Sequence, residues 1–148
     1  MIPESTPVLL DTGIIVHLCR SRAAAERLEE RFGLLSRRAA PWVSVISVGE
    51  ILAFAARNQW GAPRRQALVE LLSNLVVVDI NREAILDAYA HLDVHLSTVG
   101  RRMGQQNDLW IAATASATGA VLLTTDRDFD ELDPTHLRRE WVEPGTFR

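Results

Sequence analysis

Four acidic side chains lie where apolar runs of this sequence end or where helix-like patterns begin. They are Asp11 after the run VLL, Glu50 after WVSVIS, Asp108 at the start of DLWIAATASAT, and Asp126 after AVLLTT. Parallel strands end at one edge of a sheet, so acids at strand ends and helix starts can meet there. Clustered carboxylates repel one another, and a divalent cation converts that repulsion into binding. Because all these ligands are oxygen atoms, the pattern predicts a Mg2+ or Mn2+ site rather than a Zn2+ site.

Each acid also has a structural interpretation that needs no ligand. Ser47 and Glu50 form the pattern S-x-x-E, which predicts a capping box at a helix start. Asp108 near a helix N-terminus would be favoured by the macrodipole by about 0.3–1 kcal/mol. Asp11 can cap the helix that follows it, and Asp126 lies in a turn, where aspartate is common. Taken together, the four acids favour one cation site over four unrelated caps.

The basic residues restrict the chemistry further. All 16 are arginine, and the absence of lysine excludes mechanisms that need a lysine for Schiff-base formation, proton transfer or phosphate binding. The net charge of -3 would become -1 with one bound divalent cation and +1 with two, so it does not exclude a nucleic-acid partner. Arg101 and Arg102, just upstream of the acidic helix, are the first candidates for contact with a substrate phosphate, followed by Arg57.

Histidine and cysteine do not indicate a second site in the sequence. His91 and His95 are four residues apart on a predicted helix and could bind a metal, but no third ligand is in view. We therefore interpret them as a surface pair. Cys19 ends an apolar helical run and is interpreted as a small buried hydrophobic residue rather than a nucleophile.

The hydrophobic pattern predicts the framework that must position the acids. Strands are predicted at residues 8–10, 42–47, 76–80 and 120–124, with an optional fifth at 140–144. Helices are predicted at 14–35 with a break near Gly33, from Ser47 to about Asn58, around 67–72, after a cap at Asn81, and from Asn107 to a C-cap at Gly119; residues 97–107 are predicted to form a loop. Strands that alternate with helices through short connections predict an α/β protein with a parallel sheet sandwiched by helices.

Length and composition predict one domain over residues 1–148. The chain is long enough for one hydrophobic core, and its 47% hydrophobic and 24% charged residues are typical of a soluble globular protein. No apolar run is long enough to cross a membrane, and the N-terminus is too acidic for a secretory signal. A single cysteine suits a reducing compartment, so we expect a cytoplasmic protein without a membrane partner.

Three segments resemble a known family in sequence and in order. The segments LLDTGIIVHL, VISVGEIL and NDLWIAATASATGAVLLTTDRDF resemble the PIN domain, and within it the VapC-type toxins of bacterial toxin–antitoxin pairs. The resemblance covers nearly the whole chain, and NDLWIAATA followed by GAVLLTTDRDF is its most specific part. It implies a three-layer α/β/α fold around a parallel sheet of four to five strands. It also implies a Mg2+- or Mn2+-dependent endoribonuclease, an antitoxin partner and a homodimer.

The resemblance also assigns roles to residues of this sequence. It places the catalytic and metal-binding acids at Asp11, Glu50, Asp108 and Asp126, with Asp128 able to share or take the role of Asp126. Thr124 is predicted to orient Asp126 through a hydroxyl hydrogen bond. The exposed apolar groups predicted to contact an antitoxin are Trp60 and Phe54.

Two phosphoryl-transfer classes are excluded, and one alternative stays open. Haloacid-dehalogenase-like phosphatases need a second aspartate two residues after the first and a lysine, but position 13 is Gly13 and lysine is absent. Receiver domains also need a lysine. The remaining alternative is a non-catalytic RNA- or protein-binding module on the same fold, whose acids serve only as helix caps.

Overall fold

The computed structural model describes residues 2–147 and contains five strands and six α-helices in this range. The strands are β1 (Val8–Leu10), β2 (Trp42–Ser44), β3 (Val76–Val78), β4 (Val121–Thr124) and β5 (Arg138–Trp141). The helices are α1 (Thr12–Arg20), α2 (Arg22–Phe32), α3 (Val45–Arg57), α4 (Ala62–Ser73), α5 (Glu83–Thr98) and α6 (Gln106–Thr118), with 3-10 helices η1 (Arg127–Leu132) and η2 (Pro144–Phe147).

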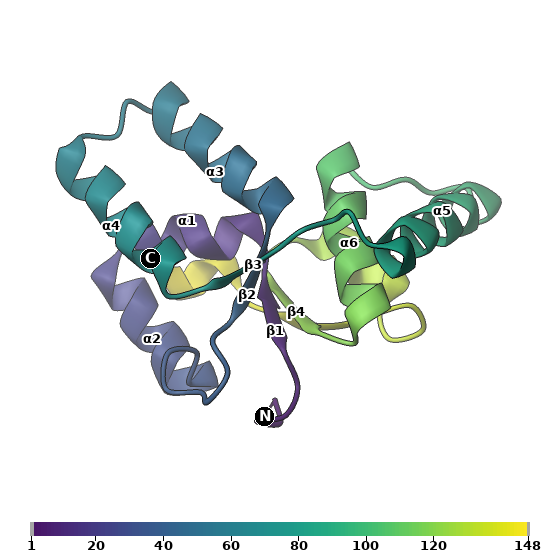
Figure 1. Ribbon diagram of the computed structural model, residues 1–148, viewed down its shortest axis with the longest axis horizontal. Coiled ribbons are helices and arrows are strands. Elements are labelled where there is room, and N and C mark those ends of the chain that lie inside the picture. The colour runs from purple at the N-terminus through teal and green to yellow at the C-terminus, as the bar shows by residue number, and fades with distance from the viewer. Residues whose placement is uncertain (1, 148) are drawn as a thin grey trace.

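The five strands form one parallel sheet in the order β3-β2-β1-β4-β5. Alternate residues of β1 point to opposite faces, so Leu10 joins one core cluster and Leu9 joins the other. Ile14 and Leu28 of α1 and α2 pack in the first cluster, and Ile111 of α6 packs in the second. Figure 1 shows α1 to α4 on one side of the sheet and α5 and α6 on the other. The predicted three-layer α/β/α sandwich is therefore confirmed, with five strands.

The second strand is shorter than the sequence predicts. The Ser44 hydroxyl accepts a hydrogen bond from the Ile46 N–H at 3.1 Å and caps α3, which begins at Val45. The predicted strand through Ser47 is therefore wrong, and so is the capping box formed with Glu50. The side chain of Ser47 is buried and accepts a hydrogen bond from the Thr12 hydroxyl of α1. Because a valine and isoleucine run suits a strand or a buried helix equally well, periodicity placed this boundary three residues too late.

Several helix boundaries also differ from the predicted ones. The first helical segment breaks at Ser21, while Gly33 in the left-handed region (φ +59°) ends α2. Asn81 does not cap α5, whose N-cap position is Arg82. Burial of Leu96 extends α5 to Thr98, into the segment predicted as a loop.

The later helices and strands occur in the predicted order, and their boundaries are slightly shifted. Helix α6 begins at Gln106 and ends at Thr118, and Gly119 forms its left-handed C-cap as predicted. Strand β3 stops at Val78, and β5 begins at Arg138 rather than at residue 140. Within residues 2–147, none of the helices is both long and apolar enough to cross a membrane.

Candidate metal centre

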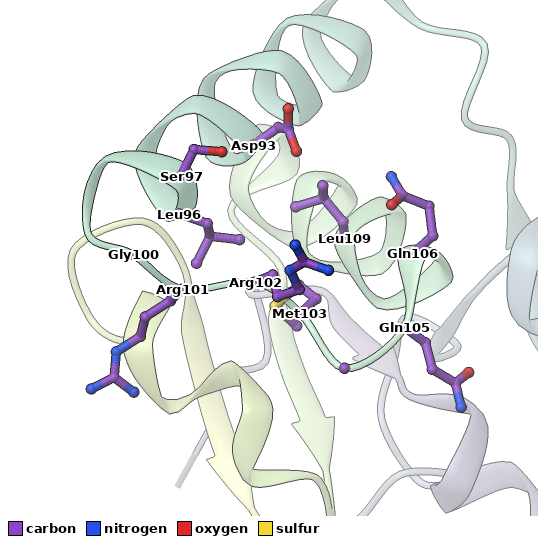
Figure 2. Close-up of a pocket in the computed structure, with 11 residues that line it drawn as sticks. Asp93, Leu96, Ser97, Gly100, Arg101, Arg102, Met103, Gln105, Gln106 and Leu109 are labelled. Carbon is purple, nitrogen blue, oxygen red and sulfur yellow. The ribbon is translucent and has the colours of Figure 1, made fainter.

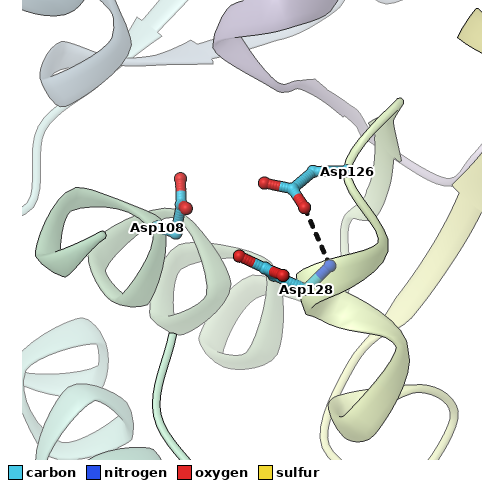
Figure 3. A group of neighbouring side chains, drawn as sticks. All are labelled: Asp108, Asp126 and Asp128. Carbon is cyan, nitrogen blue, oxygen red and sulfur yellow. Dashed lines mark hydrogen bonds between the residues drawn. The ribbon is translucent and has the colours of Figure 1, made fainter. Parts of the chain in front are cut away.

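Three carboxylates converge beyond the carboxyl end of β4. Asp108 comes from the first turn of α6, while Asp126 and Asp128 lie at the start of η1. Each offers one carboxylate oxygen, and these three oxygens all lie within 4.8 Å of one another. Figure 3 shows the Asp108 side chain facing the other two across a gap, with the Asp126 carboxylate accepting a hydrogen bond from the Asp128 N–H at 2.8 Å. The structure thus places both Asp126 and Asp128 beside Asp108.

Asp11 is held next to this cluster by the sheet register. Leu10 of β1 is paired with Leu123 of β4, so Asp11 and Thr124 end neighbouring strands. The Thr124 hydroxyl donates to Asp11 Oδ2 at 2.6 Å, and the Thr12 N–H donates to Asp11 Oδ1 at 2.8 Å. These two bonds fix the orientation of a carboxylate that is only 6% exposed.

Thr124 contacts two of the acids through its hydroxyl. Its hydroxyl donates to Asp11, while its contact with Asp126 is a hydrogen bond accepted from the Asp126 backbone N–H at 2.9 Å. The predicted hydroxyl hydrogen bond between Thr124 and Asp126 is therefore present, at the Asp126 backbone, and the bond to Asp11 is an additional contact that the sequence did not signal. One hydroxyl thus ties the end of β1 to the turn that carries Asp126.

Glu50 reaches the same edge from α3, one turn into the helix. Its Oε1 accepts a hydrogen bond from the Thr12 hydroxyl at 2.9 Å, and that hydroxyl is also hydrogen-bonded to Ser47 at 2.8 Å. Thr12 therefore links the two acids, because its backbone N–H donates to Asp11 and its side-chain hydroxyl donates to Glu50. Sequence reasoning missed this role, although Thr12 is the middle residue of the D-T-G opening.

Burial and mutual repulsion raise the pKa of two of these acids. Burial, followed by the charges of Asp126 and Glu50, raises the pKa of Asp11 to about 6 against the lowering effect of its two hydrogen bonds. Burial, followed by the charges of Asp11, Asp126, Glu50 and Asp128, raises the pKa of Asp108 to about 7. All five acids therefore share one electrostatic environment, although only three of them form the direct cluster.

The residues present fit a hard divalent cation. The cluster offers only carboxylate oxygens, which suit Mg2+ and Mn2+. Among residues 2–147, the ion pairs formed by arginine involve none of the five acids. Within the part of the chain that the structure describes, the negative charge at this edge is therefore not paired with arginine, and a bound cation would relieve that repulsion.

A glycine lets the preceding loop approach the cluster. The Gly104 N–H donates to Asp128 Oδ2 at 3.2 Å, and a Cβ at this position would collide with that carboxylate oxygen. Loop residues on both sides of Gly104 line a pocket of about 690 Å³. Nothing in the sequence signalled this contact, because it joins segments 24 residues apart.

The predicted phosphate contacts lie around this pocket. Arg101 and Arg102 both line it, and both are exposed. Figure 2 shows the two side chains pointing in different directions, and Arg101 forms an ion pair with Glu131 at 3.3 Å. Arg57 lies apart from them, in a second surface depression of about 490 Å³ that it shares with Glu50.

Comparison with known proteins gives concordant results. The family model described as PIN domain matches residues 8–134. The chain is 29% identical over 132 residues to Ribonuclease VapC5 of Mycobacterium tuberculosis, covering 88% of this chain and 92% of the relative. It is 34% identical over 118 residues to Ribonuclease VapC1 of Haemophilus influenzae strain R2866, covering 78% and 84%.

Two solved structures share the fold over almost their full length. A chain in the crystal structure of VapBC2 from Rickettsia felis, bound to a DNA fragment from their promoter, superposes with a TM-score of 0.76 at 25% identity, covering 91% of this chain and 98% of that one. A chain of VapBC-1 from nontypeable Haemophilus influenzae gives 0.70 at 28% identity, covering 92% and 98%.

Proposed function

This chain belongs to the PIN domain family, and on that premise we propose that it is a metal-dependent endoribonuclease, the toxin of a VapBC-type toxin–antitoxin pair. Relatives named Ribonuclease VapC, matched over most of their length, support the activity. The observation that carries the proposal for this chain is the convergence of Asp108, Asp126 and Asp128 within 4.8 Å at the sheet edge where Asp11 and Glu50 also lie.

The acids have distinct roles in this proposal. Asp108, Asp126 and Asp128 hold Mg2+ or Mn2+ directly, and Asp11 and Glu50 complete the negative environment through water. The bound cation would supply an activated water molecule and would offset negative charge on the scissile phosphate. Thr124 and Thr12 keep Asp11 and Glu50 in place while substrate binds.

Protons and the cation compete for the same carboxylates. Asp108, with a pKa of about 7, carries a proton for part of the time at neutral pH when no cation is bound. Because a carboxylate must lose its proton to ligate, cation affinity should rise as the pH increases through 7. A cation affinity that rises with pH would therefore distinguish a cation site from a set of helix caps.

Arginine supplies the contacts to RNA. We propose that Arg101 and Arg102 bind backbone phosphates beside the acids and that Arg57 extends this contact on the side of Glu50. The rest of the exposed surface carries both signs of charge, so steering of RNA depends on these local arginines rather than on net charge.

The partner and the assembly are also proposals. Because similar chains occur in structures described as VapBC complexes, we propose a small antitoxin partner, a homodimer and a cytoplasmic location for this single domain, residues 1–148. The predicted antitoxin anchor at Trp60 is wrong, because Trp60 is 5% exposed and packs edge-on against Phe54. Leu35 and Val69, which are 65% and 60% exposed, are the better candidates.

The test compares RNA cleavage with and without divalent cation. The purified protein should cleave RNA in Mg2+ or Mn2+, stop in EDTA, and recover when the cation is restored. Asp108→Asn should abolish cleavage while keeping the fold, and Asp87→Asn, an exposed α5 residue with the same charge change, should cleave normally. Binding of RNA without cleavage in any cation would instead support the non-catalytic binding module.

A further inference from the structure

Three of the four histidines of this chain meet at one place on the surface. His91 and His95 lie on α5, and His136 lies in the turn between η1 and β5. The ring centroids of His95 and His136 are 4.1 Å apart, and those of His91 and His136 are 5.6 Å apart. The tertiary structure thus supplies the third histidine that the sequence pattern of His91 and His95 lacked.

The backbone on both sides of this cluster is fixed by buried neighbours. Leu92 and Leu96, each next to one of the helical histidines, are at most 3% exposed. Leu132 and Leu137 are similarly buried, and the His136 N–H donates to the Leu132 carbonyl at 2.8 Å. The three imidazoles are therefore presented from two anchored segments, and only their side-chain torsions are free to change.

The ring nitrogens are available for ligation. Among the hydrogen bonds of residues 2–147, none involves a ring nitrogen of His91, His95 or His136. His91 is exposed and the other two are half-buried, so an ion can reach the rings from solvent. Burial, followed by the neighbouring His95 and His91, lowers the pKa of His136, which favours the neutral imidazole that binds metals.

We propose that His91, His95 and His136 form a binding site for a divalent transition-metal ion such as Zn2+, separate from the acidic cluster. Two histidines four residues apart on a helix present their rings to one ion. With metal–nitrogen bonds of about 2.0–2.1 Å in a tetrahedral arrangement, ring centroids lie about 5 Å apart. The 5.6 Å pair is near this spacing, although the nitrogens of the three rings do not yet all lie within 4.8 Å of one another. The 4.1 Å pair needs a side-chain rotation that opens it by about 1 Å.

The two sites differ in the ions they prefer. Imidazole nitrogen favours Zn2+, Cu2+ and Ni2+, whereas an all-carboxylate site favours Mg2+ and Mn2+. A solvent molecule would complete the coordination of a three-histidine site. An ion held by His91, His95 and His136 joins α5 to the turn before β5, so it stabilises the folded chain by mass action.

The experiment is a Zn2+ titration of the full chain in the presence of excess Mg2+, which occupies the acidic cluster. Calorimetry measures the affinity, thermal unfolding measures stabilisation, and Co2+ replaces Zn2+ to give a visible absorption band of a tetrahedral site. His136→Asn and His91→Asn should each lower the Zn2+ affinity by about 10- to 100-fold or more. His17→Asn, which changes the one histidine outside the cluster, should keep the wild-type affinity.

His91 is exposed on a helix, so His91→Asn should fold even if His136→Asn does not. Equal Zn2+ affinity in wild type and in the folded His91→Asn variant, or a Co2+ spectrum without a tetrahedral band, would overturn the proposal. RNA cleavage is not part of the measurement. Failure of the histidine site would therefore leave the nuclease proposal intact, and loss of nuclease activity would not affect the histidine site.

Discussion

Replacing Asp108 by asparagine tests the electrostatics of the acidic cluster apart from its chemistry. Asparagine has nearly the shape of the protonated aspartic acid but cannot ionise. In the metal-free protein, burial and then the charges of four other acids raise the pKa of Asp108 from 3.8 to about 7. At alkaline pH the folded wild type therefore contains an ionised Asp108 carboxylate in an unfavourable environment, and the Asp108→Asn variant does not.

The sign of the effect follows from the two pKa values. Between pH 4 and 7, the folded protein keeps a proton on Asp108 that the unfolded chain releases, so its stability falls as the pH rises. A rise in pKa from 3.8 to about 7 corresponds to about 4 kcal/mol at alkaline pH. Because the carboxylate is partly exposed, solvent screening reduces this cost to about 2 kcal/mol.

The assay is thermal unfolding in EDTA at pH 5 and pH 8. Asp108→Asn should unfold about 4–8 °C above the wild type at pH 8, because 1 kcal/mol shifts the midpoint of a chain of this size by about 2–4 °C. The difference should shrink by more than half at pH 5. Mg2+ should stabilise the wild type more than the variant, and RNA cleavage should be lost.

The matched control is Asp87→Asn, which removes one exposed acidic charge from α5 and should show no such pH dependence. If Asp108→Asn is no more stable than the wild type at pH 8 without metal, burial and the neighbouring acids do not raise the pKa of Asp108 as described. If Mg2+ stabilises both proteins equally, Asp108 does not hold the cation.

Three further changes test the surroundings of the cluster. Thr124→Val removes the 2.6 Å hydrogen bond to Asp11, so the pKa of Asp11 should rise above about 6 in an NMR titration, and denaturant unfolding should show a loss of about 1–3 kcal/mol. Gly104→Ala should displace the Asp128 carboxylate and lower cleavage by about 100-fold with little change in the unfolding midpoint; unchanged rates would remove Asp128 from the site. Arg102→Ala should weaken RNA binding and reduce the slope of log affinity against log salt by about 0.7, and an unchanged slope would mean that Arg102 contacts no phosphate.

The sequence by itself determined the order of the elements and the edge at which the acids lie. Runs such as VLL before Asp11 and AVLLT before Asp126 are buried on both faces of the sheet, so their hydrophobicity was visible without a structure. The small apolar helix after Asp108 and its C-cap at Gly119 were predictable for the same local reasons. Together with the family resemblance, these features predicted the three-layer architecture.

Only the tertiary structure decided which side chains touch one another. The parallel register of β1 and β4 directs the Thr124 hydroxyl to Asp11, and the approach of the loop at Gly104 positions Asp128. In the same way, packing of α5 against the turn before β5 brings His136 to two histidines that formed an incomplete pair in the sequence. Periodicity reports which face of an element is buried, whereas contacts between distant residues depend on strand order and register, and no local pattern encodes those.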